Sequence, residues 1–126
     1  MRVKVVVMEC RKGSAAEDTP LIYATSYKSL TDKQGFNIQI LADSGCTKSL
    51  LPEWIARKNK IRVDAERAKE YSLKNASGEN MVVKGTATIF VTPNGCRTRR
   101  AVECLVSSDL SESDLLLSWR DMKRPI

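Results

Sequence analysis

Short apolar segments separated by turn-forming residues run through most of the chain and predict a β-rich domain. Residues that favour strands, β-branched and aromatic, are concentrated at 2–10, 21–30 and 36–42. A polar stretch at 11–20, which contains glycine and proline, predicts a loop, and a turn is expected at 31–35. The second and third strands should therefore pair as a hairpin.

One short helix is expected after this hairpin. Pro52 suits the first turn of a helix, and residues 53–58 continue in a helical pattern. The apolar residues from 61 to 68 have a mixed spacing, which leaves both helix and strand open there.

The second half of the chain predicts further β-structure. A turn at 76–80 should lead into a long strand at 81–92, in which Gly85 would mark a bulge or a bend. The Pro-Asn-Gly turn at 93–95 predicts a second hairpin, whose returning strand is expected at 96–106.

The last segment combines a strand and a helix. Ser111 and Asp114 have the spacing of a capping box. The leucines at 115–117 suit a buried strand, and 120–124 suit the first turns of a helix. The pattern thus predicts a single β-rich domain over 1–126, with hairpins and one or two short helices.

Composition supports this class and indicates the compartment. The chain has 126 residues, of which 42% are hydrophobic and 29% charged, as in a globular protein of one domain. No apolar run approaches the ~20 residues that span a membrane. The valines near the N-terminus are soon interrupted by Glu9 and Arg11, unlike a signal peptide. We expect a cytoplasmic protein, or one inside a particle assembled in the cytoplasm, with no membrane partner.

Cysteine and histidine usage narrows the possible chemistry. The four cysteines form no CxxC pair and are interpreted as free thiols. The chain contains no histidine, which excludes Ser-His and Cys-His nucleophile systems and histidine-containing zinc sites. Catalysis would have to use carboxylate, hydroxyl, amine or thiol groups. This favours an aspartic mechanism without establishing it.

A net charge of +6 introduces nucleic-acid binding as an alternative function. Six basic residues gather between 57 and 69, where Asp64 and Glu66 partly offset them. No aromatic residue lies within this cluster to stack on a base. A solvated surface is therefore the simpler interpretation of the cluster.

The strongest candidate for chemistry is the acidic turn that follows the third predicted strand. An apolar run at 38–42 leads directly into Asp43, although burying an unpaired carboxylate is unfavourable. Ser44 adds a hydroxyl, and Gly45 permits a backbone turn that a side chain would block. An ordinary turn is the alternative interpretation of these three residues taken alone.

The segment as a whole resembles the active-site loop of retropepsin-like aspartic proteases. In that family the loop has the pattern apolar-apolar-Asp-Ser/Thr-Gly-Ala/Cys-Ser/Thr-x-Ser-apolar, where x is any residue. Every position from Leu41 to Leu50 fits this pattern. The similarity looks closest to proteases of gypsy-type LTR retrotransposons and their domesticated relatives.

A second landmark of that family is a flap hairpin with a glycine-containing tip, a few tens of residues downstream. The segment at 71–83 resembles it, with the tip at 75–78. The third landmark is an apolar pair followed by Gly, Arg, and Asp or Asn, before a helix. Residues 117–122 resemble this motif, except that Trp119 stands where the family usually has glycine. The resemblance extends from Phe36 to Lys123.

The resemblance implies an all-β, mostly antiparallel acid-protease barrel with a flap hairpin and one short C-terminal helix. It implies that Asp43 is the catalytic carboxylate, supported by Ser44 and Gly45 of the same loop. The substrate-binding residues that it implies are Cys46, Thr47, Ala76, Ser77 and Gly78. The residues that it places near the site as structural support are Trp119, Arg120 and Asp121.

One such loop supplies half of an aspartic protease site, so the resemblance implies a homodimer in which the second carboxylate is Asp43 of another copy. The substrate would be an extended peptide, as in polyprotein processing, and no metal, cofactor or nucleic acid is expected. The chain ends at Ile126, before the family's C-terminal interface strand. Either the strand at 2–10 forms the dimer edge, or the natural interface lies outside this chain. A non-catalytic dimerisation or peptide-binding domain and a basic nucleic-acid-binding module remain alternatives.

Overall fold

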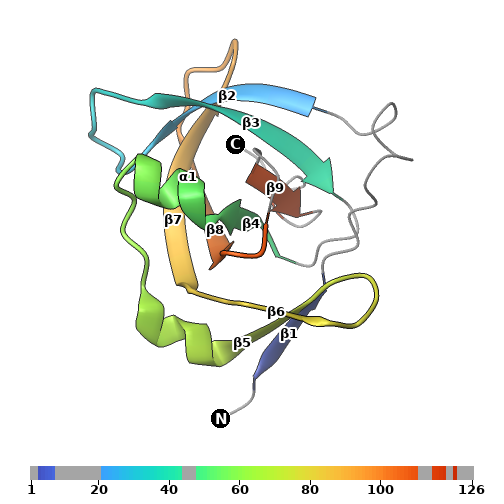
Figure 1. The fold of residues 1–126 in the computed structure, drawn as a ribbon. Coiled ribbons are helices and arrows are strands. Elements are labelled where there is room, and N and C mark those ends of the chain that lie inside the picture. The colour runs from blue at the N-terminus through green and yellow to red at the C-terminus, as the bar shows by residue number, and fades with distance from the viewer. Residues whose placement is uncertain (1–2, 8–20, 44–47, 111–114, 119–120, 122–126) are drawn as a thin grey trace.

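The computed structural model describes residues 3–7, 21–43, 48–110, 115–118 and 121, which form a β-barrel with a small second sheet below it (Figure 1). The barrel closes in the order β2-β3-β9-β4-β8-β7. Its strands are β2 (Leu21–Tyr27), β3 (Phe36–Asp43), β9 (Leu115–Ser118), β4 (Leu50–Pro52), β8 (Arg100–Ser107) and β7 (Gly85–Pro93).

The barrel mixes two kinds of strand pairing. Four of the pairings between neighbouring strands are antiparallel. The pairs β3 with β9 and β4 with β8 are parallel, and each joins segments far apart in the chain. The prediction of an all-β, mostly antiparallel domain is therefore confirmed for the described residues.

The predicted hairpin at the start of the barrel is present. β2 and β3 are antiparallel, with Ala24 opposite Ile38 and Ile22 opposite Ile40. Successive side chains of a strand point to opposite faces, so Ile38 and Ile40 share the inner face of β3 and are almost fully buried. Asp43 is the last residue of this strand.

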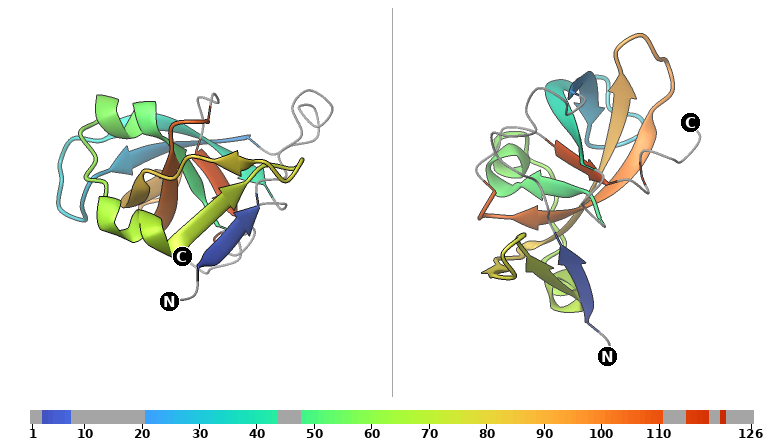
Figure 2. Two further views of the ribbon diagram at one scale, coloured as in Figure 1. Left: turned by 60° about the horizontal axis from the view of Figure 1, so that its bottom comes forward. Right: turned by 90° about the vertical axis from the view of Figure 1, so that its right-hand side faces the viewer.

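The second sheet has the order β1-β5-β6, formed by β1 (Lys4–Val7), β5 (Tyr71–Lys74) and β6 (Asn80–Met81). β1 runs parallel to β5. Val6 is buried together with Leu73 in a cluster that also contains Leu50 and Leu116 of the barrel. Val5 lies on the other face of β1 and is 56% exposed, and Val3, just before the strand, is 51% exposed. Within the predicted strand at 2–10, the described strand β1 thus belongs to the sheet that carries the β5–β6 hairpin (Figure 2).

Two helical elements connect the barrel to the second sheet. α1 (Glu53–Lys58) begins directly after Pro52, as predicted, and buries Ile55 and Ala56. The segment for which both helix and strand were left open is extended at first and then forms a 3₁₀ helix, η1 (Ala65–Glu70).

The prediction of one long strand at 81–92 is wrong, because β6 ends at Met81 and β7 begins at Gly85. Gly85 has φ +150°, and a Cβ built on it would lie 2.3 Å from the carbonyl oxygen of Asp64. Asp64 pairs with Thr86 in a β-bridge at this point. The close approach of two backbones requires glycine here, which explains the bend.

Several other predictions can be compared with the structure. The turn at 93–95 is confirmed, but its returning strand begins at Arg100 rather than at 96. The strand at the last leucines is confirmed as β9. The helix predicted at 120–124 lies outside the described residues apart from Asp121, whose backbone is helical. Among the described helices, none is long and apolar enough to cross a membrane.

Candidate active site

The end of β3 brings Asp43 next to the end of β9. Asp43 is in register with Ser118, the last residue of β9. β9 also pairs on its other side with β4, where Leu50 is opposite Leu116. β3 and β4 therefore lie on opposite sides of β9 in the barrel (Figure 1). The two segments that carry the sequence motifs, around 43 and around 118, are neighbours in space.

Three polar side chains join these segments, and we call them the Ser49–Ser118–Asp121 cluster. The backbone N–H of Ser118 donates to Ser49 Oγ over 3.0 Å, although the two residues are 69 positions apart in sequence. The hydroxyl of Ser49 donates in turn to Asp121 Oδ2. Ser118 Oγ also donates to Asp121 Oδ2, over 3.1 Å. One carboxylate thus binds the start of β4 to the end of β9.

The cluster is buried and well partnered, as buried polar groups generally need to be. Ser49 is fully buried and Ser118 is 1% exposed. The carbonyl of Ser49 accepts from the N–H of Leu105 in β8 over 2.9 Å. Ser118 Oγ accepts from the N–H of Asp121 over 3.2 Å, in the manner of a helix N-cap. These bonds fix the backbone on both sides of residues 44–47.

The sequence motifs assign no role to Ser49 beyond its place in the loop pattern, and none to Ser118. A local signal was available, because Ser118 and Asp121 have the three-residue spacing of a capping box. The contact between Ser49 and Ser118 has no such signal, since it depends on the register of three strands.

Lys48, just before Ser49, anchors the same segment through ion pairs. Its Nζ lies 2.9 Å from Glu103 Oε1 on β8. Arg67 of η1 reaches the other oxygen of Glu103 over 3.1 Å and also pairs with Glu70. Burial raises the pKa of Glu103, but hydrogen bonds from Lys48 and Arg67 outweigh this effect and hold the pKa below its usual value. Glu103 therefore stays ionised and links η1 to the segment after residue 47.

Tyr71 connects these cations to the hairpin of the second sheet. The Nζ of Lys48 lies 5.4 Å from the centre of the Tyr71 ring, and the Nζ of Lys4 lies 5.7 Å from it. Both distances suit cation–π attraction. Tyr71 is the first residue of β5, so the base of the hairpin is held against the segment that follows the Asp43 loop.

The β5–β6 hairpin ends in a tight turn on the same side of the molecule as the end of β3 (Figures 1 and 2). Asn75 Oδ1 accepts from the N–H groups of Ser77 and Glu79 over 3.0 and 2.9 Å. Gly78 has φ +83°, which favours glycine, and a Cβ there would meet no atom within 4 Å. The predicted turn is thus present and its tip is exposed.

The predicted site residues fall into three groups. Asp43 is described through its backbone, and Asp121 through its side chain as well. Ala76, Ser77 and Gly78 lie together in the exposed hairpin turn. The predicted residues that lie outside the described part of the chain are Ser44, Gly45, Cys46, Thr47, Trp119 and Arg120.

The described residues contain no group of Asp, Glu and Cys suited to holding a metal ion. Burial raises the pKa of the Cys104 thiol, which keeps it protonated in the core. The described residues thus place the backbone of Asp43 at the end of β3, in register with Ser118 of the Ser49–Ser118–Asp121 cluster. Comparisons of the chain with protein-family models, with curated proteins and with solved structures find no match.

Proposed function

We propose that the chain is an aspartic endopeptidase of the retropepsin-like kind, active as a homodimer. The observation that carries the proposal is the register of Asp43 with Ser118, braced by the Ser49–Ser118–Asp121 cluster. Two of the three motifs on which the sequence resemblance rests, the Asp43 loop and the motif at 117–122, are thus carried by neighbouring strand ends, which supports a shared active-site framework.

The chemistry follows from two Asp43 carboxylates, one from each protomer, facing each other across a two-fold axis. Two carboxylates ~3 Å apart cannot both ionise, so they share one proton and titrate as a pair. This behaviour is well established for aspartic proteases in general. The ionised group accepts a proton from water, which attacks the scissile carbonyl. The protonated group polarises that carbonyl and stabilises the negative charge that develops on its oxygen.

The remaining residues of the loop and the hairpin provide binding in this proposal. Ser44 braces the two loops across the dimer, and Gly45 allows the backbone to approach the peptide. Cys46 and Thr47 border the substrate channel. The hairpin turn at 76–78 acts as the flap, whose backbone binds an extended peptide through strand-like hydrogen bonds.

The substrate in this proposal is a polyprotein of a retroelement, processed in the cytoplasm or in particles assembled there. The edge of β1 that faces away from β5 meets no further strand among the described residues, so a second chain could pair with it. This edge stays a predicted dimer contact.

The test is cleavage of an apolar peptide library between about pH 4 and 7, where such carboxylate pairs titrate. Wild type should cleave, and Asp43→Asn should remain folded and inactive. Asp64→Asn is the matched control, because Asp64 is exposed and its side chain caps no helix. Equal activity of wild type and Asp43→Asn would refute the assignment. A wild-type dimer that cleaves nothing would instead indicate the non-catalytic alternative.

A further inference from the structure

The positive charge of the chain is concentrated in three segments, 21–41, 53–62 and 88–101. Together they contain nine Lys or Arg residues and two Asp or Glu residues. The net charge of the whole chain is +6, so these segments account for all of it and the rest is close to neutral. Such a separation is typical of a surface that binds a polyanion.

The β2–β3 turn and the β7–β8 turn lie at the end of the barrel away from the second sheet, and α1 lies beside the barrel below them (Figure 1). Arg57 and Lys60 of the second segment line a separate hollow together with Lys84. Arg99, after the β7–β8 turn, stacks over the Tyr27 ring at 3.5 Å from its centre. Its guanidinium donates to the carbonyls of Ser29, Leu30 and Asp32 over 3.0, 2.9 and 2.6 Å. These bonds fasten the β2–β3 turn to the β7–β8 turn, so the basic surface is held by the structure.

An open groove of about 730 Å³ lies between α1 and the first half of β3, and we call it the α1–β3 groove. β9 pairs with β3 only from Ile40 onward, so within the described part of the chain no strand pairs with 36–39 on that side, and the groove lies there. Tyr23 and Trp54 line the groove and are 55% and 45% exposed. Both side chains expose aromatic surface in this groove, where a planar ligand could stack on it.

The polar lining of the groove is suited to bases and phosphates. Asn37, Gln39, Asn59 and Asn94 supply amide groups, each of which can both donate and accept. Lys58 lines the groove as well. The adjoining hollow, which shares Asn59 with the groove, adds two further lysines; its charged lining is Lys28, Lys33 and Asp32.

We propose that the α1–β3 groove binds single-stranded nucleic acid, with bases stacked on Tyr23 and Trp54 and the phosphates near Lys58 and Lys33. Aromatic faces with a surrounding cationic rim are how proteins hold single strands with little sequence preference. The groove is a site separate from Asp43, which lies about 13 Å along β3 from Gln39, at 3.3 Å per residue.

This site differs from the basic cluster at 57–69 that the sequence suggests. In the structure Arg67 pairs with Glu70 and Glu103, and Lys69 lies 3.7 Å from Glu66, on the side of the second sheet. The cluster is therefore divided. Lys58, from its first part, lines the same groove as Trp54, which lies just before the cluster in sequence, and Tyr23, which is distant in sequence. These two side chains supply the aromatic surface that the cluster itself lacks.

The test uses fluorescence anisotropy with labelled RNA and DNA single strands of about 10 nucleotides, a length within the usual range of such sites. Binding should weaken between about 50 and 200 mM salt, because phosphate contacts release counterions. Trp54→Ala and Tyr23→Ala should each weaken binding about fivefold or more through lost stacking. Trp54→Phe, which keeps an aromatic face, should retain most of the affinity. The ratio of RNA to DNA affinity identifies which of the two is preferred.

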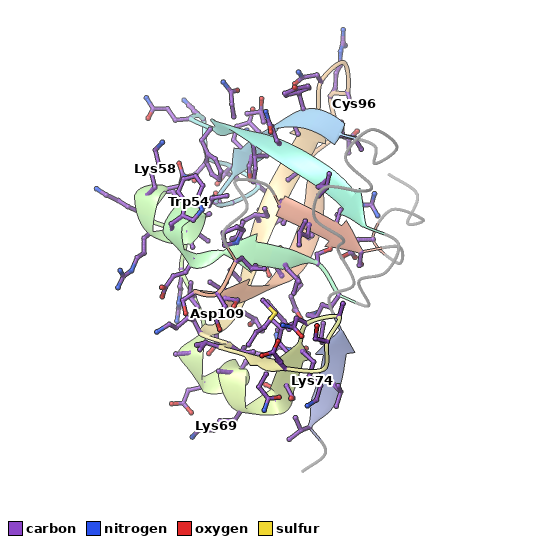
Figure 3. All side chains as sticks on the ribbon, turned by 45° about the vertical axis from the view of Figure 1, so that its right-hand side comes forward. Trp54, Lys58, Lys69, Lys74, Cys96 and Asp109 are labelled. Carbon is purple, nitrogen blue, oxygen red and sulfur yellow. The ribbon has the colours of Figure 1, made fainter. Side chains whose placement is uncertain are left out.

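The matched control for the cations is a second pair of lysines. Lys33→Ala combined with Lys58→Ala should lower both affinity and salt dependence, whereas Lys69→Ala combined with Lys74→Ala should leave them unchanged (Figure 3). Circular dichroism verifies that each variant is folded. Asp43→Asn should bind as wild type does, so this inference can fail independently of the proposed protease activity. Four results would each overturn the proposal of a single-strand site. Two concern the variants: equal losses in the two lysine pairs, or unchanged affinity in Trp54→Ala and Tyr23→Ala. The other two concern the ligand: equally tight binding of duplex, or no binding at low salt.

Discussion

Replacing Ser49 with alanine removes a hydroxyl that serves two hydrogen bonds in the Ser49–Ser118–Asp121 cluster. The N–H of Ser118 would lose its acceptor at 3.0 Å, in a position that is 1% exposed. A buried donor without a partner destabilises by about 1–3 kcal/mol. The bond to Asp121 adds about 1 kcal/mol, since that carboxylate still accepts from Ser118 Oγ. We expect Ser49→Ala to lower the free energy of unfolding by about 2–4 kcal/mol in total.

Ser26 provides the matched control, because it is also fully buried but its Oγ has no hydrogen-bond partner in the described part of the chain. Ser26→Ala removes an unsatisfied polar group, so the free energy of unfolding should stay the same or rise. Urea denaturation measures both variants. With a slope of about 2 kcal/mol per molar urea, the midpoint for Ser49→Ala should fall by about 1–2 M. A midpoint for Ser49→Ala at or above that for Ser26→Ala would refute the bracing role of the cluster.

Further predictions concern the backbone, an ion pair and the thiols. Gly85→Ala should destabilise by about 3 kcal/mol or more, through both strain and backbone overlap, whereas Gly78→Ala should cost about 1–2 kcal/mol from strain alone; thermal unfolding compares them. The pKa of Glu103 is lower in the folded chain than in the unfolded chain, so its contribution is present at neutral pH and lost as the pH falls through the folded pKa. Glu103→Gln should therefore destabilise at pH 7, by about 1 kcal/mol or less for a partly exposed pair, and have little effect in acid, as urea titrations at both pH values would show. A thiol reagent at mildly alkaline pH should modify exposed Cys96 and spare buried Cys104 until the chain unfolds, as peptide mapping by mass spectrometry would establish.

Local signals predicted much of the fold. The β2–β3 hairpin, α1 and the turn at 93–95 each depend on residues close in sequence. The parallel pairings of the barrel depend on contacts between distant segments, which no local pattern specifies. β4 has three residues, too few for a periodic pattern to emerge. The break before Gly85 follows from the contact of Gly85 with Asp64, in a separate segment. The glycine in the sequence indicated a bend, but it did not indicate that the strand is divided there into β6 and β7.

The candidate site also combines features that a local sequence signal predicts with features that depend on tertiary contacts. The motif at Asp43 and the capping spacing of Ser118 with Asp121 are present in the sequence. The hydrogen bond between Ser49 and Ser118 depends on tertiary register and could not be predicted from either motif alone. The division of the basic cluster at 57–69 likewise becomes visible only in three dimensions, because Arg67 of η1 pairs with Glu70 and Glu103.

The most direct test of the proposed mechanism is subunit mixing, since it asks whether each active site needs two copies of Asp43. Wild type and Asp43→Asn are mixed in equal amounts, allowed to exchange subunits, and assayed for peptide cleavage at a fixed total chain concentration. If both carboxylates are required, about a quarter of the dimers are active and the rate falls to about a quarter of the wild-type rate. A rate of about three quarters would show that one Asp43 in a dimer suffices, and a rate of about half would show that each chain works independently; either result would contradict the two-carboxylate mechanism.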